Sequence, residues 1–86
     1  ALRGIEPNPA SSRVTVRFVL PVAAPATLEV LDLEGRRVAL VEVGGLGPGA
    51  HAVVLDRDLA GLPTGLYAVR LRQLGQTRTL KLSLMR

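Results

Sequence analysis

The segment LPTGLYAVRLRQLGQTRTLKLSLMR, from Leu62 to Arg86, decides the fold of this chain. A Pro-Thr-Gly turn opens it, and two runs of alternating apolar and polar residues follow, separated by the turn QLGQ at residues 73–76. Alternation with a period of two is typical of strands that bury one face. The segment therefore predicts an antiparallel hairpin. Chain ends are usually disordered. Because this end keeps the strand pattern, we expect it either to pair with a neighbouring strand or to have a function of its own.

The same alternation recurs through the rest of the chain. Further strands are expected in RVTVRFVL (13–20), ATLEVLDL (26–33), RVALVEV (37–43) and HAVVLD (51–56), with another near residues 2–6. No segment keeps a 3.6-residue period over helical length. About seven short strands between turns predict an all-β fold, an immunoglobulin-like antiparallel β-sandwich of two sheets, without the Cys and Trp of antibody domains.

The apolar positions of these strands predict the core. Its expected members are Val14, Val16, Phe18, Leu28, Val30, Val53, Leu55, Tyr67, Val69, Leu71, Leu80 and Leu82. In the last strand Leu80, Leu82 and Leu84 alternate with Thr79, Lys81 and Ser83. We therefore expect the leucine face to pack inward and the Lys81 face to remain in water.

Length and composition indicate one small domain. The chain has 86 residues, of which 48% are hydrophobic and 2% aromatic. No apolar run approaches the roughly 20 residues of a spanning helix, so no membrane insertion is expected. Because the sequence lacks an initiator Met and a leader, we expect residues 1–86 to be a single C-terminal domain of a larger parent protein, with residues 1–8 as a linker or first strand.

The basic character of the chain does not indicate a nucleic-acid partner. Its formal net charge is +4, and its basic residues are scattered over turns and outward strand positions without a dense run. A β-sheet that binds nucleic acid stacks bases on aromatic side chains beside such charges. Only Phe18 and Tyr67 could serve, so nucleic-acid binding is not expected.

Catalytic and metal-binding chemistry is poorly represented. There is no cysteine, and the single histidine, His51, has no predicted acid or base partner, so it is interpreted as a strand-edge residue. Asp32, Asp56 and Asp58 lack the dense spacing of a calcium loop and are interpreted as turn residues. The glycine-rich segment GGLGPG (44–49) is expected to be a flexible loop. We therefore expect no enzyme activity, no metal and no cofactor.

Several segments occur in an order that resembles a known family. They are NPASSRVTVRFVLP (Asn8–Pro21), LEVLDLEGRRV (Leu28–Val38), GPGAHAVVLD (Gly47–Asp56), LPTGLYAVRL (Leu62–Leu71) and the closing KLSLMR (Lys81–Arg86). In this order they resemble the C-terminal sorting domain of proteins exported by the type IX secretion system (the Por secretion system type A sorting domain). The resemblance covers nearly the whole chain from Asn8. It departs from the family at Leu31, where Tyr is frequent, and at Leu55, where Trp is frequent.

This resemblance implies a non-catalytic secretion signal of immunoglobulin-like fold. Such a domain directs an N-terminal cargo domain through the periplasm and the outer-membrane machinery to the cell surface or the extracellular space. A sortase-like protease commonly removes it. The residues expected to carry recognition are Gly65, Tyr67, Lys81, Leu82, Leu84 and Arg86. Of these, only Lys81 and Arg86 are expected to be dispensable for the fold, and a monomer is expected.

Other interpretations of the sequence remain open at this point. The domain could be an accessory module that binds carbohydrate beside an extracellular enzyme, but sugar binding usually needs several exposed aromatic side chains. It could also be a spacer. The flagellar hook-capping protein contains related sandwiches with the same Asp-x-x-Gly turn, whereas the lead-in Leu62-Pro63 and the Lys-Leu ending favour the sorting domain.

Overall fold

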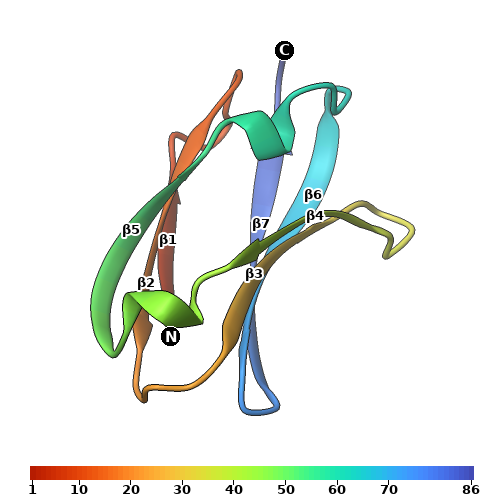
Figure 1. Ribbon diagram of the computed structural model, residues 1–86. Coiled ribbons are helices and arrows are strands. Elements are labelled where there is room, and N and C mark those ends of the chain that lie inside the picture. The colour runs from red at the N-terminus through yellow and green to blue at the C-terminus, as the bar shows by residue number, and fades with distance from the viewer.

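The computed structural model describes residues 1–86 as two antiparallel sheets packed face to face (Figure 1). The strands are β1 (Leu2–Glu6), β2 (Val14–Leu20), β3 (Ala26–Leu31), β4 (Arg37–Glu42), β5 (Gly49–Leu55), β6 (Gly65–Gln73) and β7 (Gln76–Leu84). Two single 3₁₀ turns, η1 (Gly44–Leu46) and η2 (Arg57–Leu59), are the only helices, and neither could span a lipid bilayer.

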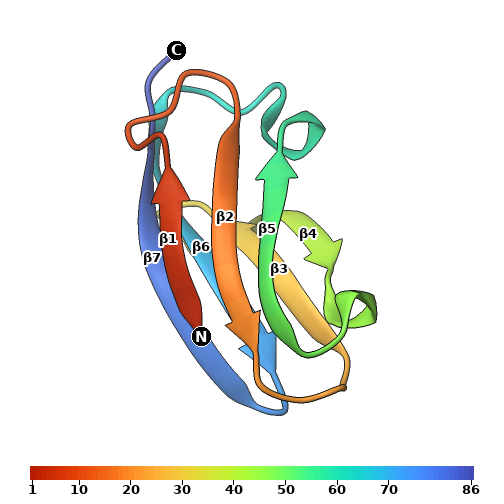
Figure 2. The same cartoon turned by 90° about the vertical axis from the view of Figure 1, so that its left-hand side faces the viewer.

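The strand order confirms the predicted immunoglobulin-like sandwich. One sheet has the order β1-β2-β5 and the other the order β4-β3-β6-β7, and every pairing is antiparallel. Figure 2 shows the three-stranded sheet in front of the four-stranded one. The strand expected near Leu2–Glu6 is β1, and the expected C-terminal hairpin is β6–β7, joined at the turn Gln73–Gln76.

The core lies between the two sheets and follows the predicted alternation. Its buried apolar side chains are Ala10, Val14, Val16, Phe18, Leu20, Ala26, Leu28, Val30, Val43, Leu55, Leu59, Tyr67, Val69, Leu71, Leu82 and Leu84. Two predicted members, Val53 and Leu80, are only partly buried. They lie on β5 and β7, which are edge strands, so a neighbouring strand covers them on one side only.

The expectation of a flexible loop at residues 44–49 is wrong in one respect, because the loop contains the ordered turn η1. Gly44 packs there against the backbone of the β2–β3 connection. A Cβ atom at Gly44 would lie 2.7 Å from the carbonyl oxygen of Ala24 and 2.7 Å from the amide nitrogen of Ala26. Glycine is therefore required at this position by space, and the loop is fixed where it crosses between the sheets.

The two flanks of the sandwich are protected differently. On one flank, the segment after β1 covers the end of β7: Asn8 accepts from Ser83 N–H at 3.0 Å, and Ala10 N–H donates to the Ser83 carbonyl at 2.8 Å. On the other flank, no backbone hydrogen bond outside the paired strands involves β4 or β5. The free edge of β5 also has no charged residue and no proline. The backbone edge of β7 is therefore covered near its C-terminal end, whereas the edges of β4 and β5 have no such cover.

Candidate functional site

The final strand divides its side chains between core and solvent. Leu82 and Leu84 are fully buried, whereas Lys81 is exposed on the outer face of the four-stranded sheet. The register explains this division, because Lys81 lies opposite Ala68 and Leu82 lies opposite the inward-facing Tyr67. Of the three leucines predicted to face inward, Leu82 and Leu84 are buried and Leu80 is partly buried, and the predicted outward direction of Lys81 is confirmed. Leu82 and Leu84 can therefore affect recognition only through the fold.

Tyr67 fixes the corner where the chain enters β6. Its ring is buried, and its hydroxyl donates to the carbonyl oxygen of Pro63 at 2.6 Å. A tyrosine near the start of this strand that bonds back to the preceding turn is the tyrosine corner of immunoglobulin-like sandwiches. Gly65 lies inside the corner, where an added Cβ would make only an ordinary 3.9 Å contact with the Tyr67 ring. Tyr67 thus fixes the turn before the terminal hairpin, whereas the space around Gly65, the first residue of β6, does not require a glycine.

Arg86 is hydrogen-bonded to two other segments of the fold, in contrast to the expectation that the fold does not use its side chain. Its Nε donates to the carbonyl of Leu62 at 2.7 Å, and its other guanidinium nitrogens bond the carbonyls of Leu59 and Ser11. Its backbone N–H also donates to the Thr64 hydroxyl at 2.9 Å. One side chain therefore ties the end of β7 to the β5–β6 connection and to the β1–β2 loop.

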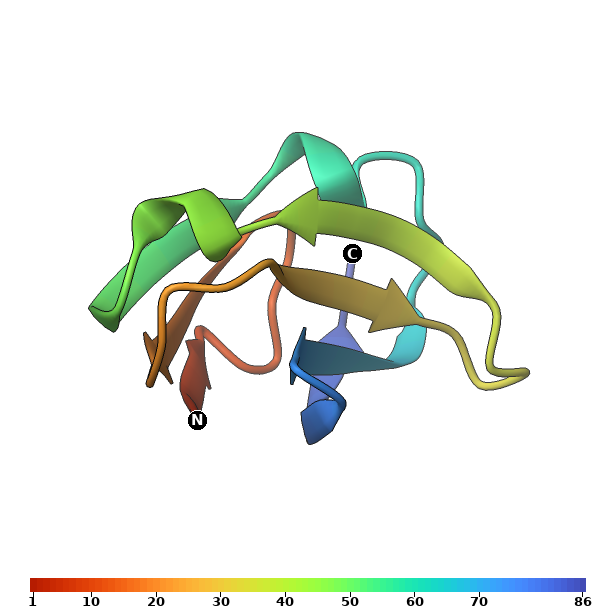
Figure 3. The same cartoon turned by 60° about the horizontal axis from the view of Figure 1, so that its bottom comes forward.

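The β3–β4 turn is held by Asp32, as its sequence predicts. Asp32 Oδ1 accepts from the backbone N–H groups of Glu34 and Arg36, and Oδ2 accepts from Arg36 Nε at 2.8 Å. Burial alone would raise the pKa of the Asp32 carboxyl, but the bonds from Arg36 and Glu34 outweigh this effect and lower it. Figure 3 shows the turn (yellow) projecting beyond the end of the sheet.

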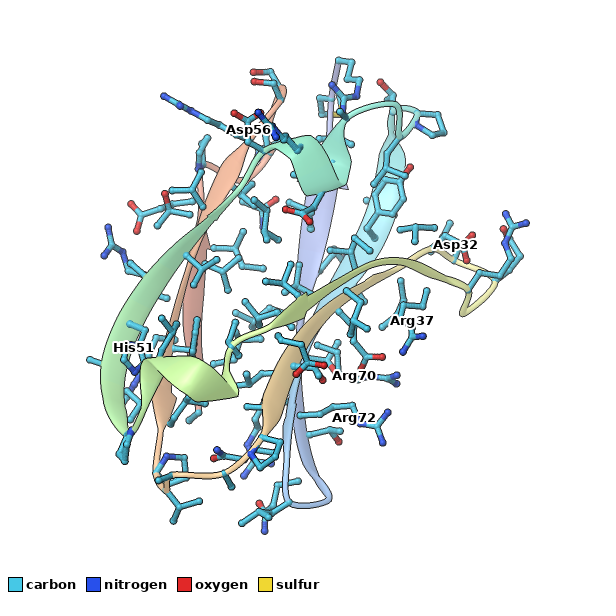
Figure 4. The ribbon with its side chains drawn as sticks, in the orientation of Figure 1. Asp32, Arg37, His51, Asp56, Arg70 and Arg72 are labelled. Atoms are coloured by element: carbon cyan, nitrogen blue, oxygen red, sulfur yellow. The ribbon has the colours of Figure 1, made fainter.

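A cluster of charges that sequence reasoning missed lies on the outer face of the four-stranded sheet. Glu29, whose side chain is 3% exposed, accepts from Arg70 Nε at 2.9 Å, and guanidinium nitrogens of Arg37 and Arg72 lie 3.5 and 3.8 Å from its carboxylate. The bond from Arg70 is the main reason that the pKa of Glu29 is lowered. The three arginines point away from the core (Figure 4).

These side chains define what we call the basic face: Arg37, Arg70, Arg72 and Lys81, arranged around Glu29. Arg70 lies opposite Thr79 in the β6–β7 pairing, so Lys81 is its diagonal neighbour, at about 7–8 Å by the usual geometry of sheets. The alternation of Arg70 and Arg72 with apolar residues could have indicated their outward direction. Their meeting with Glu29 depends on strand order, which the sequence does not provide.

A groove of about 540 Å³ adjoins the basic face. It runs between the β3–β4 turn and the β6–β7 hairpin, and its lining includes Leu31, Leu33, Leu66, Ala68, Arg70 and Lys81. The groove therefore joins parts of three segments that the sequence analysis singled out, those beginning at Leu28, Leu62 and Lys81. Its surface combines aliphatic side chains with the positive charges of Arg70 and Lys81, and its one carboxylate, Asp32, is paired with Arg36.

The remaining candidate residues are not gathered into a site. His51 Nε2 donates to the carbonyl of Gly47 at 2.7 Å, and its ring centroid lies 5.7 Å from that of Phe18. Asp56 is at the far end of β5 from His51 (Figure 4), and no three acidic or histidine side chains are grouped to hold a metal ion. A second groove, of about 560 Å³, is lined by none of the predicted recognition residues.

Comparison with known proteins bears on this arrangement. A family model described as a secretion system C-terminal sorting domain matches residues 5–85, nearly the whole chain. A search of curated proteins finds no match. The matched range includes both sheets, the tyrosine corner and the basic face.

Proposed function

The chain belongs to the family of secretion system C-terminal sorting domains, and on this premise we propose how its folded surface serves export. Members of the family are signals for type IX secretion, which carries an N-terminally fused cargo to the cell surface or beyond it. The chain is accordingly a sorting signal rather than a carbohydrate-binding or spacer module. The match over residues 5–85 is the observation that carries this conclusion.

We further propose that residues 1–86 form the sorting domain of a larger parent protein and have no catalytic activity of their own. His51 is bonded to a backbone carbonyl and Asp32 is engaged in the β3–β4 turn, so neither is paired with a second group as an acid and a base. The route would lead through the periplasm, the domain would act as a monomer, and a sortase-like protease would cut between cargo and domain.

Within this function, the six predicted recognition residues divide into two groups. Leu82 and Leu84 are buried, Tyr67 and Arg86 fasten the ends of the hairpin, and Gly65 begins β6 opposite Leu84. Lys81 and Arg86 both have exposed side chains without an ion-pair partner, but the Arg86 guanidinium is hydrogen-bonded to backbone carbonyls, so Lys81 alone has an exposed side chain without a polar partner. We propose that Lys81 contacts the export machinery, and that the other five residues present it.

A reporter fused in front of residues 1–86 tests this proposal in a bacterium that has type IX secretion. We expect Lys81→Ala to reduce surface display and to leave the reporter in the periplasm. The free energy of unfolding of the isolated domain should change by no more than about 0.5 kcal/mol, as is usual for substitutions of exposed residues. Thr77→Ala, on the same face and strand, is the matched control. Normal export of the Lys81→Ala variant would exclude this lysine as a recognition contact.

The absence of catalysis is tested on the isolated domain. We expect no hydrolysis of peptide, ester or glycoside substrates and no calorimetric signal with cell-wall polysaccharides, because neither a paired acid and base nor an aromatic platform is present. Micromolar binding of a polysaccharide would show that the domain has a carbohydrate-binding role in addition to sorting.

A further inference from the structure

We propose that the basic face and its adjoining groove form the docking surface for an acidic, partly apolar segment of a protein of the export machinery. This inference rests on the proposed sorting function and extends it from Lys81 to a defined surface. The surface comprises Arg37, Arg70, Arg72 and Lys81, together with the aliphatic lining of the groove.

The charge of this surface is incompletely neutralised. Glu29 is shared by three guanidinium groups, and the only other carboxylate in the strands of this face is Glu42, which lies opposite Thr27. The carboxylates of the β3–β4 turn are engaged with Arg36. Cations held close together repel one another, and a partner that supplies carboxylates relieves this repulsion. The face is therefore complementary to an acidic surface.

The guanidinium group of Arg70 is also held in place before any partner binds, and those of Arg37 and Arg72 lie 3.5 and 3.8 Å from the same carboxylate. Glu29 is almost completely buried beneath them and holds Arg70 in a direct hydrogen bond. The side chains of Arg37 and Arg72 remain 54% and 51% exposed, so their free N–H groups face solvent. Arginine presents several donors in a planar fork that matches a carboxylate. A guanidinium group that is held in place in advance lowers the conformational-entropy cost of binding.

The apolar part of the surface favours a protein as the occupant. Leu33, Leu40 and Leu66 are 75%, 43% and 43% exposed. Leu33 and Leu66 line the groove, and Leu40 lies opposite Glu29 on the neighbouring strand. Exposed leucines beside arginines are the composition of a protein–protein interface. A phosphate headgroup would engage the cations but would leave the leucines in water.

The protected flank of β7 indicates that a partner approaches the face rather than this edge. Asn8 accepts from Ser83 N–H and donates to the Lys81 carbonyl at 2.9 Å, while Ala10 bonds the backbone beyond them. The backbone groups that strand addition would use next to Lys81 are thus occupied. The Lys81 side chain remains free to contribute to a contact made by side chains.

Matched pairs of variants test the proposal in the reporter fusion described above. Arg72→Gln with Lys81→Gln neutralises two cations of the basic face, and Arg13→Gln with Arg17→Gln neutralises two cations in and beside β2, in the other sheet. We expect surface display to fall about tenfold for the first pair and to stay within about twofold for the second, since lost charge complementarity weakens association. Melting of each isolated domain shows whether folding is retained.

A photo-crosslinking residue at Thr79, which lines the groove, identifies the class of partner. We expect a protein adduct that requires Arg72 and Lys81. An adduct with lipopolysaccharide, or no adduct, would overturn the assignment to a protein. A fusion lacking the whole domain separates the two levels of inference. If the reporter is exported without the domain, the sorting function is refuted. If export requires the domain but is unchanged by the Arg72 and Lys81 substitutions, only this docking surface is refuted.

Discussion

Replacing Arg86 with alanine removes the guanidinium contacts that fasten the end of β7, and we expect it to destabilise the domain measurably. The side chain donates to carbonyl groups of Leu59, Leu62 and Ser11. Hydrogen bonds to charged groups contribute about 1.5–3 kcal/mol each where water is excluded. The bond to Leu59 is partly buried, and the other two are exposed to water that can replace them. The total loss should therefore be about 1–2 kcal/mol.

Thermal unfolding of the isolated domain, followed by circular dichroism, measures this loss. For a domain of this size, 1–2 kcal/mol corresponds to a decrease in Tm of about 4–16 °C. Arg86→Lys keeps the charge but offers a single ammonium group, so we expect an intermediate Tm. Lys81→Ala serves as the comparison, with a change within about 0.5 kcal/mol.

If Arg86→Ala and Lys81→Ala unfold at the same temperature, the contacts of Arg86 contribute nothing to the fold and this reasoning is wrong. If the expected difference is found, loss of export in an Arg86 variant cannot be attributed to recognition alone. Lys81 then provides the cleaner test of the sorting signal.

Three further substitutions test the fold. Tyr67→Phe removes the hydroxyl bonded to Pro63 and should cost about 1 kcal/mol in urea unfolding; an unchanged midpoint would contradict the tyrosine corner. Phe18→Ala should lower the free energy of unfolding by about 3–5 kcal/mol in the same assay, because the ring is fully buried. A decrease below about 1 kcal/mol would show that Phe18 is not central to the core. In the folded state the pKa of Glu29 is lowered below its ordinary value of 4.5, chiefly by the hydrogen bond from Arg70. The ionised Glu29 therefore stabilises the fold above pH 4.5, and this stabilisation is lost as the pH falls through the folded-state pKa. Glu29→Gln should therefore reduce the acid dependence of the unfolding free energy, and an identical pH profile would refute this role.

Local patterns in the sequence predict the strands and their buried faces well. Alternation in β7 separates Leu82 and Leu84 from Lys81, and the structure places them accordingly. Alternation defines the face of a side chain but not how fully neighbours cover it. For this reason Val53 and Leu80, on edge strands, were predicted to be core residues although they are only partly buried.

The missed features depend on contacts between distant parts of the chain. Glu29 and Arg70 are separated by 41 positions, and Arg86 and Leu59 by 27. Their meeting requires the order of strands within the sheet and the path of the β5–β6 connection. Neither follows from residue spacing, because several strand orders bury the same apolar faces. The sequence therefore predicts Lys81 as an outward side chain but not its arginine neighbours.

The unequal protection of the two flanks affects how copies of the domain behave when they are crowded during transport. Open-ended fibres grow when each copy offers two free edges, so that every addition leaves another edge exposed. Here Asn8 and Ala10 cover the end of β7, and β1 carries Arg3, Glu6 and an irregular register between Leu2 and Gly4. Edge-to-edge pairing is thereby favoured at the flank formed by β4 and β5, which no other segment covers. Because β4 and β5 lie on the same flank, two copies that join there about a two-fold axis would cover both open edges of each other, and association would end at a closed pair instead of propagating into a polymer.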